Sequence, residues 1–291
     1  MYFCMILEEQ YRYDAMPTAV LQQLRQWGHT VDVLEPRLSV TCLSRLLERA
    51  YDAYILKTVS NGPGLSILEA AEAVGIPTIN HPHAIRLVRD KAVAMALAHA
   101  RGIPTPMTYF VTELSLLEQL PAEYFPLVVK PTHGSSCRDI HLVRNPSALK
   151  HLHLDTYAYS SWLAQRYEEN SGFDIKIYVA GHEVFAVSKP SPLHPEIEVQ
   201  KHCIVLPSPL HSLALAVGNL FGLDIYGLDV VETQHGPIVV DINDFPSFGH
   251  VPEAEKLVAS CILETAQRLK QEQIRSKTVL KHLQLDTICM A

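Results

Sequence analysis

Strand-like and helix-like segments alternate through the first eighty residues, and this alternation restricts the chain to few folds. Short apolar runs predict strands at residues 2–7, 30–34, 51–59 and 76–79. Helices are predicted between them, at residues 17–27, 43–50 and 65–74. Strands that alternate with helices pair in parallel, with the helices on the faces of the sheet. Residues 1–84 are therefore predicted to form an α/β domain with a small parallel sheet.

The pattern changes beyond residue 84. Asp90 is placed to cap a helix that runs to Gly102, and an apolar strand at residues 125–131 carries Lys130 near its end. Strands then dominate, at residues 162–167, 174–179, 183–188, 225–231 and 238–242, before a last helix at 253–270. We predict a mixed α/β and α+β chain, with a central lobe at 85–165, a C-terminal lobe at 166–270 and a tail at 271–291 of open role.

Composition narrows the classes of partner. The 291 residues include 24 Lys and Arg against 31 Asp and Glu, a net charge of −7. This balance argues against nucleic acid and anionic membranes as partners, but it allows a local basic pocket for a small phosphorylated molecule. No apolar run approaches the roughly 20 residues that cross a bilayer. The six cysteines form no Cys-x-x-Cys pair, so we expect reduced thiols and a cytoplasmic location.

Two weaker patterns have ordinary explanations. The segment Gly62-Pro63-Gly64 lies between a predicted strand and helix, as in dinucleotide-binding loops, but the third glycine of that motif is missing. An ordinary loop is the interpretation we favour. The histidine pairs at 81/83 and 151/153 have spacings that metal ligands use, but their polar or proline-containing surroundings favour surface residues.

The strongest candidate site lies in a predicted hairpin formed by residues 225–231 and 238–242. A turn centred near His235 places Asp229 opposite Asp241, and Asn243 lies on the same face as Asp241 because strand side chains alternate. Opposed buried acids repel each other unless a cation lies between them. An incomplete set of hard oxygen ligands suits Mg²⁺ when phosphates complete its shell. Exposed acids are the alternative, which the apolar flanking residues disfavour.

Basic and small polar residues supply matching phosphate contacts. Lys130 ends a buried strand, from which its long side chain can present an ammonium group in a cleft. Lys91 opens the helix after Asp90. The loop that follows Lys130 can offer backbone N–H groups to phosphates, or it can be a plain turn; it contains His133, Gly134, Ser135, Ser136, Cys137 and Arg138.

Taken in order, these segments resemble the ATP-grasp superfamily. Further similar segments are Leu163-Ala164-Gln165-Arg166-Tyr167, Phe173 to Gly181, Gly227-Leu228-Asp229 and Asp241 to Pro246. The resemblance implies an ATP-grasp fold, with a preceding parallel-sheet domain and two lobes that enclose ATP. It implies ATP with two Mg²⁺ ions as cofactors, and the metal ligands Asp229, Asp241 and Asn243. The implied ATP contacts are Lys91, Lys130, His133, Gly134, Ser135, Ser136, Gln165, Tyr167, Glu168 and Ser191.

Members of the superfamily differ in the acceptor to which the phosphoryl group of ATP is transferred. RimK-like and glutathione-synthetase-like ligases form an acyl phosphate that an amine attacks, and they tend to carry Asp-x-Arg and an Arg-x-x-Asn-like stretch. This chain has Asp174-Ile175-Lys176 at the first place, and residues 187–209 contain no Arg and no Asn. Segments 133–138, 188–191 and 241–246 instead resemble the inositol polyphosphate kinases.

The leading prediction is therefore a kinase of a small anionic acceptor, with an ATP-dependent carboxylate–amine ligase as the alternative. Lys176, Lys189 and Arg138 are expected to face the acceptor, and Lys130 to assist transfer. Three cations indicate an anion there, either a phosphorylated polyol or a carboxylate. A non-catalytic nucleotide-binding module is a third hypothesis, which the complete set of metal ligands disfavours. The oligomeric state is open.

Overall fold

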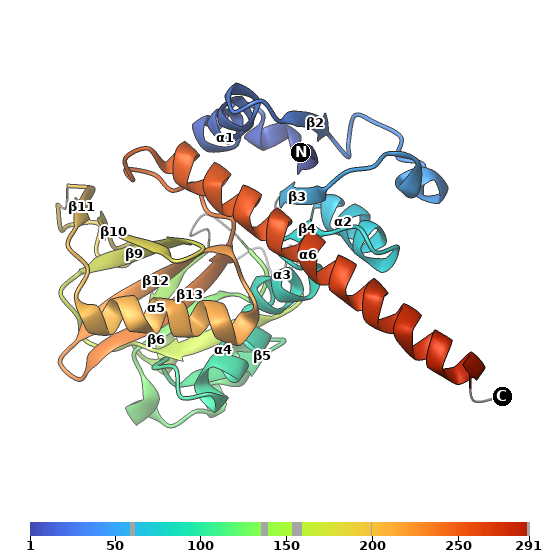
Figure 1. Ribbon diagram of the computed structural model, residues 1–291. Coiled ribbons are helices and arrows are strands. Elements are labelled where there is room, and N and C mark those ends of the chain that lie inside the picture. The colour runs from blue at the N-terminus through green and yellow to red at the C-terminus, as the bar shows by residue number, and fades with distance from the viewer. Residues whose placement is uncertain (59–61, 135–138, 153–158, 199, 290–291) are drawn as a thin grey trace. The chain divides into compact units, whose positions relative to one another are not determined.

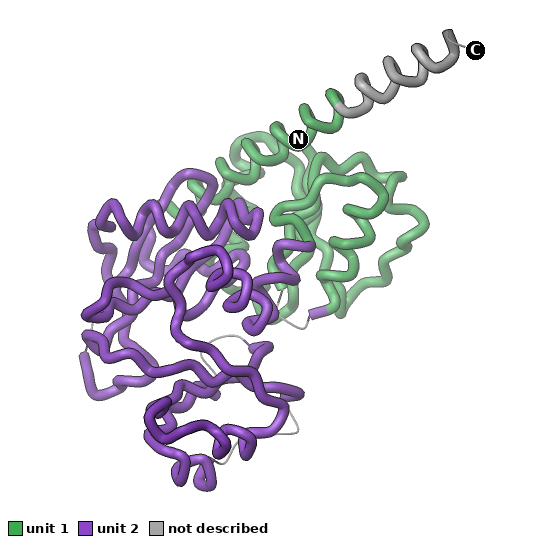
Figure 2. Tube along the Cα trace, turned by 90° about the horizontal axis from the view of Figure 1, so that it is seen from below, with its two compact units in different colours: residues 1–58, 63–82, 253–291 green, residues 59–62, 83–252 purple. Residues whose placement is uncertain are grey.

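The computed structural model describes residues 1–58, 62–134, 139–152, 159–198 and 200–289, with side chains as far as Arg275. The chain divides into two compact units, which Figure 2 colours separately. Unit 1 contains Met1–Thr58, Pro63–Pro82 and Glu253–Ala291, and unit 2 contains Val59–Gly62 and His83–Pro252. The lobe boundaries predicted at residues 84, 165 and 270 stay a prediction.

Unit 1 contains the parallel sheet that the alternation predicts. Its strands lie in the order β2-β1-β3-β4, and all neighbours are parallel. The strands are β1 (Tyr2–Leu7), β2 (Thr30–Leu34), β3 (Ala53–Lys57) and β4 (Thr78–Ile79). The helices of the same region are α1 (Ala15–Gln26) and α2 (Gly64–Ala73), with short 3₁₀-helices at Glu9–Tyr11 and Leu43–Glu48. The α-helix predicted at residues 43–50 is thus a 3₁₀-helix.

The last helix is longer than predicted. Helix α6 (Ala254–Cys289) continues through Lys270, where the sequence pattern indicated an end. It returns the chain to unit 1, where Lys270 Nζ donates to Asp52 Oδ1 at 2.7 Å and Gln273 Nε2 donates to the carbonyl of Gly75 at 2.8 Å. Among the described residues, no helix combines the length and the apolar character needed to cross a membrane. The predicted cytoplasmic location stays a prediction.

Unit 2 is built around two antiparallel sheets. The larger has the strand order β11-β10-β9-β12-β13. Its strands are β9 (Phe173–Ala180), β10 (Glu183–Pro190), β11 (His202–Ile204), β12 (Ile225–Thr233) and β13 (Gly236–Asp244). Helix α5 (Ser208–Phe221) lies across one face, as Figure 1 shows, and its Leu210, Ala214 and Val217 enter the core of this sheet. The sequence analysis missed α5.

The smaller sheet has the strand order β5-β8-β6-β7 and its own core around Trp162. Its strands are β5 (Thr108–Val111), β6 (Leu127–Pro131), β7 (His141–Val143) and β8 (Trp162–Arg166). Short 3₁₀-helices lie in the same region at Leu114–Gln119, Ala122–Tyr124 and Pro146–His151. The mixed α/β and α+β class expected from the sequence is confirmed.

Two helices lead from the parallel sheet region into unit 2. Helix α3 (Pro82–Arg89) ends one residue before Asp90, and α4 (Lys91–Ala100) starts one residue after it. The Asp90 carboxylate accepts hydrogen bonds from the backbone N–H groups of Ala92 and Val93, at 3.0 and 3.3 Å, which confirms the predicted cap. This cap sets the direction of α4 and hence the place of Lys91, its first residue.

Candidate active site

The β12–β13 hairpin brings the predicted acids together. Asp229 lies opposite Asp241, and Gly227 lies opposite Asn243, as the spacing predicted. The position of the turn differs, because Thr233 pairs with Gly236 and a bulge follows Asp229. Val240 is the extra residue in β13. It shifts the register by one residue, so that Asp229 still lies opposite Asp241 although the turn is not centred on His235. The pairing of the acids was therefore predicted correctly, whereas the bulge was not.

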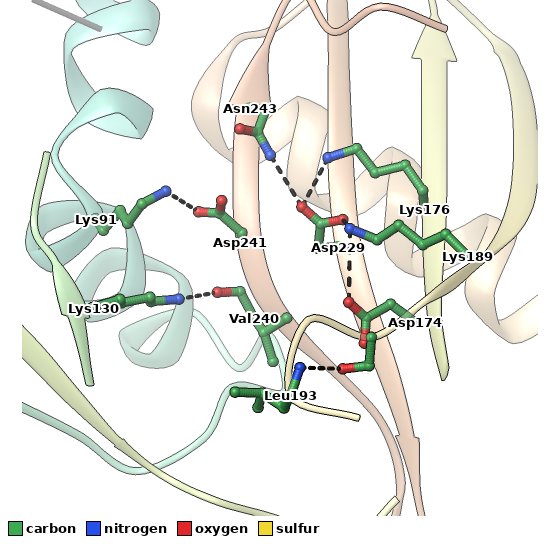
Figure 3. Close-up of polar contacts among 11 residues, drawn as sticks. Lys91, Lys130, Asp174, Lys176, Lys189, Leu193, Asp229, Val240, Asp241 and Asn243 are labelled. Carbon is green, nitrogen blue, oxygen red and sulfur yellow. Dashed lines mark hydrogen bonds and ion pairs between the residues drawn. The ribbon is translucent and has the colours of Figure 1, made fainter. Parts of the chain in front are cut away.

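The bulge has a direct role in the site. It leaves Val240 without a partner residue on β12, which frees its carbonyl from the regular ladder. Lys130 Nζ, from β6 of the smaller sheet, donates to this carbonyl at 2.7 Å. Because Lys130 is buried, its ammonium needs such an acceptor. The contact ties the two sheets together at the point where the acids lie (Figure 3).

Asp229 is at the centre of a network of charges (Figure 3). Its Oδ2 accepts from Lys176 Nζ at 2.8 Å and from Asn243 Nδ2 at 3.3 Å, while Lys189 Nζ lies 2.8 Å from its Oδ1. Burial opposes ionisation of Asp229, but the two ammonium groups outweigh it and hold its pKa well below the usual range. Asp229 is thus an ionised buried carboxylate.

Asp241 forms the second charged pair. Its Oδ1 accepts from Lys91 Nζ at 2.6 Å. Burial acts to raise its pKa, and nearby Asp229 does the same, but Lys91 and Lys130 reverse this and lower the pKa. Two ionised acids therefore lie opposite each other, Asp229 beside Lys176 and Lys189 and Asp241 beside Lys91.

Asp174 is a site residue to which the sequence analysis assigned no role, although it noted the segment Asp174-Ile175-Lys176. It is buried on β9, two residues from Lys176 and on the same face, and its Oδ2 lies 3.7 Å from Lys189 Nζ. Burial raises its pKa, although Lys189 opposes that change. The two-residue alternation along β9 was the signal that could have identified it.

A pocket joins these residues to the predicted ATP contacts. Its walls come from both sheets and from the segments that follow β8 and β10. The predicted residues that line it are Lys91, Lys130, Gly134, Gln165, Tyr167, Glu168, Lys189, Ser191, Asp229 and Asp241. Lys176 and Asn243 are not lining residues of the pocket, but both donate hydrogen bonds to Asp229, which is one. Ser135, Ser136 and Arg138 lie outside the described residues.

The remaining predicted contacts have partners of their own. Gln165 is buried and its Nε2 donates to Thr108 Oγ1 at 3.2 Å. The Tyr167 hydroxyl forms a hydrogen bond with His194 Nε2 at 2.8 Å. His133 lies next to Asp90, with its Nε2 at 3.9 Å from an oxygen of that carboxylate. Gln165 and Tyr167 thus reach the pocket, whereas His133 lies at the start of α4.

The donor set fits a magnesium ion that also binds phosphates. Asp229 Oδ1 is buried and accepts no hydrogen bond from the described residues, although Lys189 lies close to it. No group of three His, Cys, Asp or Glu side chains in the described part could hold a metal alone. Two carboxylates and an amide leave coordination positions for other hard oxygens. Phosphate oxygens of a nucleotide are such ligands, so the residues fit Mg²⁺ with ATP.

The comparisons with known proteins agree with this geometry. A model of the RimK-like ATP-grasp domain matches residues 88–262, more than half of the chain and all of the site. The chain therefore belongs to the RimK-like ATP-grasp family. The resemblance to ATP-grasp proteins and the ATP-grasp fold are both confirmed.

Individual relatives point the same way. A probable alpha-L-glutamate ligase from Legionella pneumophila is 27% identical over 216 residues, which cover 70% of this chain and 72% of the relative. A probable alpha-L-glutamate ligase 1 from Shewanella amazonensis is 26% identical over 272 residues, covering 84% and 88%. The crystal structure of a RimK domain ATP-grasp protein from Sphaerobacter thermophilus has a TM-score of 0.69 at 19% identity, covering 90% of this chain and 99% of that one.

These findings change the order of the two functional hypotheses. They support an ATP-grasp enzyme, and they back the ligase alternative better than the inositol polyphosphate kinase that led in the sequence analysis. The kinase led because residues 187–209 contain no Arg. In the structure Lys176 and Lys189 place positive charge beside Asp229, so the missing arginines do not mean missing cations.

Proposed function

We propose that this chain is a RimK-like ATP-dependent carboxylate–amine ligase. A carboxylate oxygen of one substrate attacks the γ-phosphorus of ATP and ADP leaves. The resulting acyl phosphate is attacked by an amine, and inorganic phosphate leaves as the amide bond forms. The observation that carries the proposal is the RimK-like match over residues 88–262, which includes every acid and lysine of the pocket.

The charges of the site support separate roles for its lysines. Lys91 and Lys130 lie beside Asp241 and Val240, and we assign them to the phosphates of ATP. Lys176 and Lys189 lie on the other side, around Asp229 and Asp174, and we assign them to the substrate carboxylate and the acyl phosphate. A cation beside each anionic group reduces the electrostatic repulsion between the ATP phosphates and the substrate carboxylate when the two are brought together.

The metal and the loop after β6 complete the proposed site. Asp229, Asp241 and Asn243 hold Mg²⁺, in our proposal two ions, which neutralise charge on the transferred phosphoryl group. Gln165, Tyr167, Glu168 and Ser191 contact the nucleoside. Gly134, which lines the pocket, contacts the phosphates. The roles expected from the sequence for His133, Ser135 and Ser136 at the phosphates, and for Arg138 at the acceptor, stay predictions. The proposed carboxylate substrate is a small anion, because Lys176 and Lys189 lie on the side of the site that we assign to it.

L-Glutamate is the first amine to test, because relatives are named alpha-L-glutamate ligases. The protein is incubated with Mg-ATP, L-glutamate and short peptides with free carboxyl termini. Mass spectrometry then searches for peptides extended by one glutamyl residue, while ³¹P NMR follows ATP. The ligase requires ADP and inorganic phosphate in equal amounts with the extended peptide, and only when both substrates are present.

Two results contradict the proposal. A new phosphomonoester signal that needs no amine, with a phosphorylated polyol as acceptor, establishes the kinase instead. Binding of Mg-ADP without turnover across a broad panel of acids and amines establishes a nucleotide-binding module. Asp241→Asn serves as the inactive control in every assay.

A further inference from the structure

Two segments that line the pocket are joined to each other by side chains. The first, residues 167–172, follows β8. The second, residues 191–197, follows β10 and is called the 191–197 loop here. The Tyr167 hydroxyl of the first forms a hydrogen bond with His194 Nε2 of the second at 2.8 Å, and the two rings lie 6.0 Å apart. His194 does not line the pocket itself, so its effect on the pocket runs through its neighbours.

The 191–197 loop provides one wall of the pocket. Ser191, Pro192 and Leu193 are lining residues, and they immediately precede His194. A compact turn holds them, because the His194 N–H donates to the Ser191 carbonyl at 3.2 Å and the Ile197 N–H donates to the His194 carbonyl at 3.1 Å. A displacement of His194 therefore moves Leu193 as well.

The 167–172 segment is held in place by contacts of its own. Asn170 Nδ2 donates to the Glu168 carbonyl at 2.9 Å, and Asn170 Oδ1 accepts from the Gly172 N–H at 2.8 Å. Asn170 also forms an isolated β-bridge with Thr233 at the end of β12. These contacts do not involve the 191–197 loop, so Tyr167 is a fixed point to which His194 binds.

Gly172 allows the two segments to approach closely. Its φ of +79° favours glycine, and a β-carbon there would lie 2.1 Å from Ile197 Cδ1 and 3.6 Å from His194 Cγ. The space beside Gly172 is thus filled by the 191–197 loop. The hydrogen bond and this packing both hold the 191–197 loop against the 167–172 segment.

We propose that His194 is a positioning residue for the nucleotide: by binding Tyr167, it holds Pro192 and Leu193 as a wall of the pocket. This inference rests on the proposed function, because it takes the pocket as the nucleotide site. Other lining residues, Val128 of β6, Ile140 just before β7, and Val231 and Ile238 of the hairpin, are apolar like Leu193. A planar base between apolar walls loses affinity when one wall is free to move.

The test compares Mg-ADP binding by isothermal titration calorimetry in the full chain. His194→Phe and Tyr167→Phe each remove one partner of the Tyr167–His194 hydrogen bond, and each is expected to weaken binding about fivefold. His194→Phe also removes the 3.3 Å contact of Nδ1 with Glu196 Oε1, which lies at an exposed position of the loop. The double variant is expected to bind no more weakly than the single ones, because both remove the same interaction. His194→Gln keeps a polar side-chain nitrogen and is expected to bind within about twofold of the wild type.

His202→Phe is the matched control. His202 is an exposed histidine of β11 in unit 2. It pairs with Ser188 on β10, which is next to Lys189 in the chain and therefore lies on the opposite face of the strand from Lys189. The Nδ1 of His202 contacts the Gln200 carbonyl at 2.8 Å. We expect Mg-ADP affinity equal to that of the wild type.

A role confined to stability is excluded by a second measurement. Once turnover is established, the KM for ATP is expected to rise in His194→Phe while kcat and the KM values of the other substrates stay unchanged. Equal Mg-ADP affinity in wild type, His194→Phe and Tyr167→Phe overturns the inference. So does additive weakening in the double variant. A wild type that binds no Mg-ADP contradicts the proposed function instead, so the two failures are distinct.

Discussion

Lys91 and Asp241 lie 150 residues apart in the sequence, and Lys91 Nζ donates to Asp241 Oδ1 at 2.6 Å. Lys91 is the first residue of α4, where the helix N–H groups are partly positive and a cation is unfavourable. Asp241 offsets this cost, and Asp90 caps the same helix end. Arg89 adds a two-bond pair with Asp244, at 3.0 and 2.9 Å. The start of α4 is therefore tied to the end of β13 by charge.

Asp241→Asn is expected to reduce ligase turnover about 100-fold or more, because it removes a metal ligand and the partner of Lys91. Circular dichroism is expected to show a folded protein with a lower melting temperature, since Lys91 then lacks its counter-charge. Glu232→Gln, an exposed change in the same hairpin, is the control and is expected to keep full turnover. Substantial turnover of Asp241→Asn contradicts the metal assignment.

Lys130→Met is expected to weaken Mg-ADP binding about tenfold or more, because a charge-assisted contact to phosphate is lost. The variant also removes the donor to the Val240 carbonyl at the bulge. Calorimetry measures the affinity, and Lys150→Met, at an exposed lysine of the 3₁₀-helix Pro146–His151, is the matched control. If both variants bind alike, Lys130 does not contact the phosphates.

Lys176→Arg is expected to retain most of the turnover, whereas Lys176→Met is expected to lose about tenfold or more. The reason is that the site needs a cation beside Asp229, at a position where related ligases tend to carry arginine. The comparison is made in kcat and in the KM of the carboxylate substrate. Equal activity of the Met and Arg variants argues against a role for this charge.

Asp32 is expected to make stability depend on pH in unit 1. Hydrogen bonds from Tyr2 and Tyr51 hold its pKa below the usual range, with Arg49 nearby. Because the folded pKa is lowered, the stabilisation is complete above about pH 4 and is lost as the pH falls through the lowered value. Asp32→Asn is therefore expected to melt below the wild type at pH 7, with a difference that shrinks on acidification.

Thermal melts from pH 7 to pH 2 measure this difference. Glu48→Gln is the control, because Glu48 forms an exposed pair with Arg45 only three residues away and such pairs contribute little. A melting difference for Asp32→Asn that is constant across this range contradicts the prediction.

The hairpin and α5 show where sequence patterns succeed and fail. The pairing of Asp229 with Asp241 follows from strand alternation and a glycine-containing turn, both local properties. The Val240 carbonyl at the bulge accepts a hydrogen bond from Lys130 of another sheet, a contact that no local pattern indicates. Helix α5 was missed because its N-cap residue is Pro207, which provides no side-chain capping hydrogen bond. The helix start therefore carries no sequence signal that distinguishes it from the preceding proline-containing loop.

The choice between ligase and kinase shows a different limit. The argument for a kinase rested on the absence of Arg and Asn from residues 187–209, although Lys189 lies within that stretch and Lys176 lies on the preceding strand, β9. Their shared contact with Asp229 arises because β9, β10 and β12 align at this level of the sheet. Sequence order alone does not show that two lysines 13 residues apart point to one carboxylate.

By itself, the sequence determined most of the strands, the cap at Asp90 and the two opposed acids, because each depends on residues within a few positions or across one turn. Only the tertiary structure decided which cation meets which acid, and that His194 binds Tyr167. The physical reason is that these contacts join separate strands and loops, and the packing of both sheets sets their distances. The sequence specifies which side chains carry a charge or can form hydrogen bonds, but the fold determines which side chains they pair with.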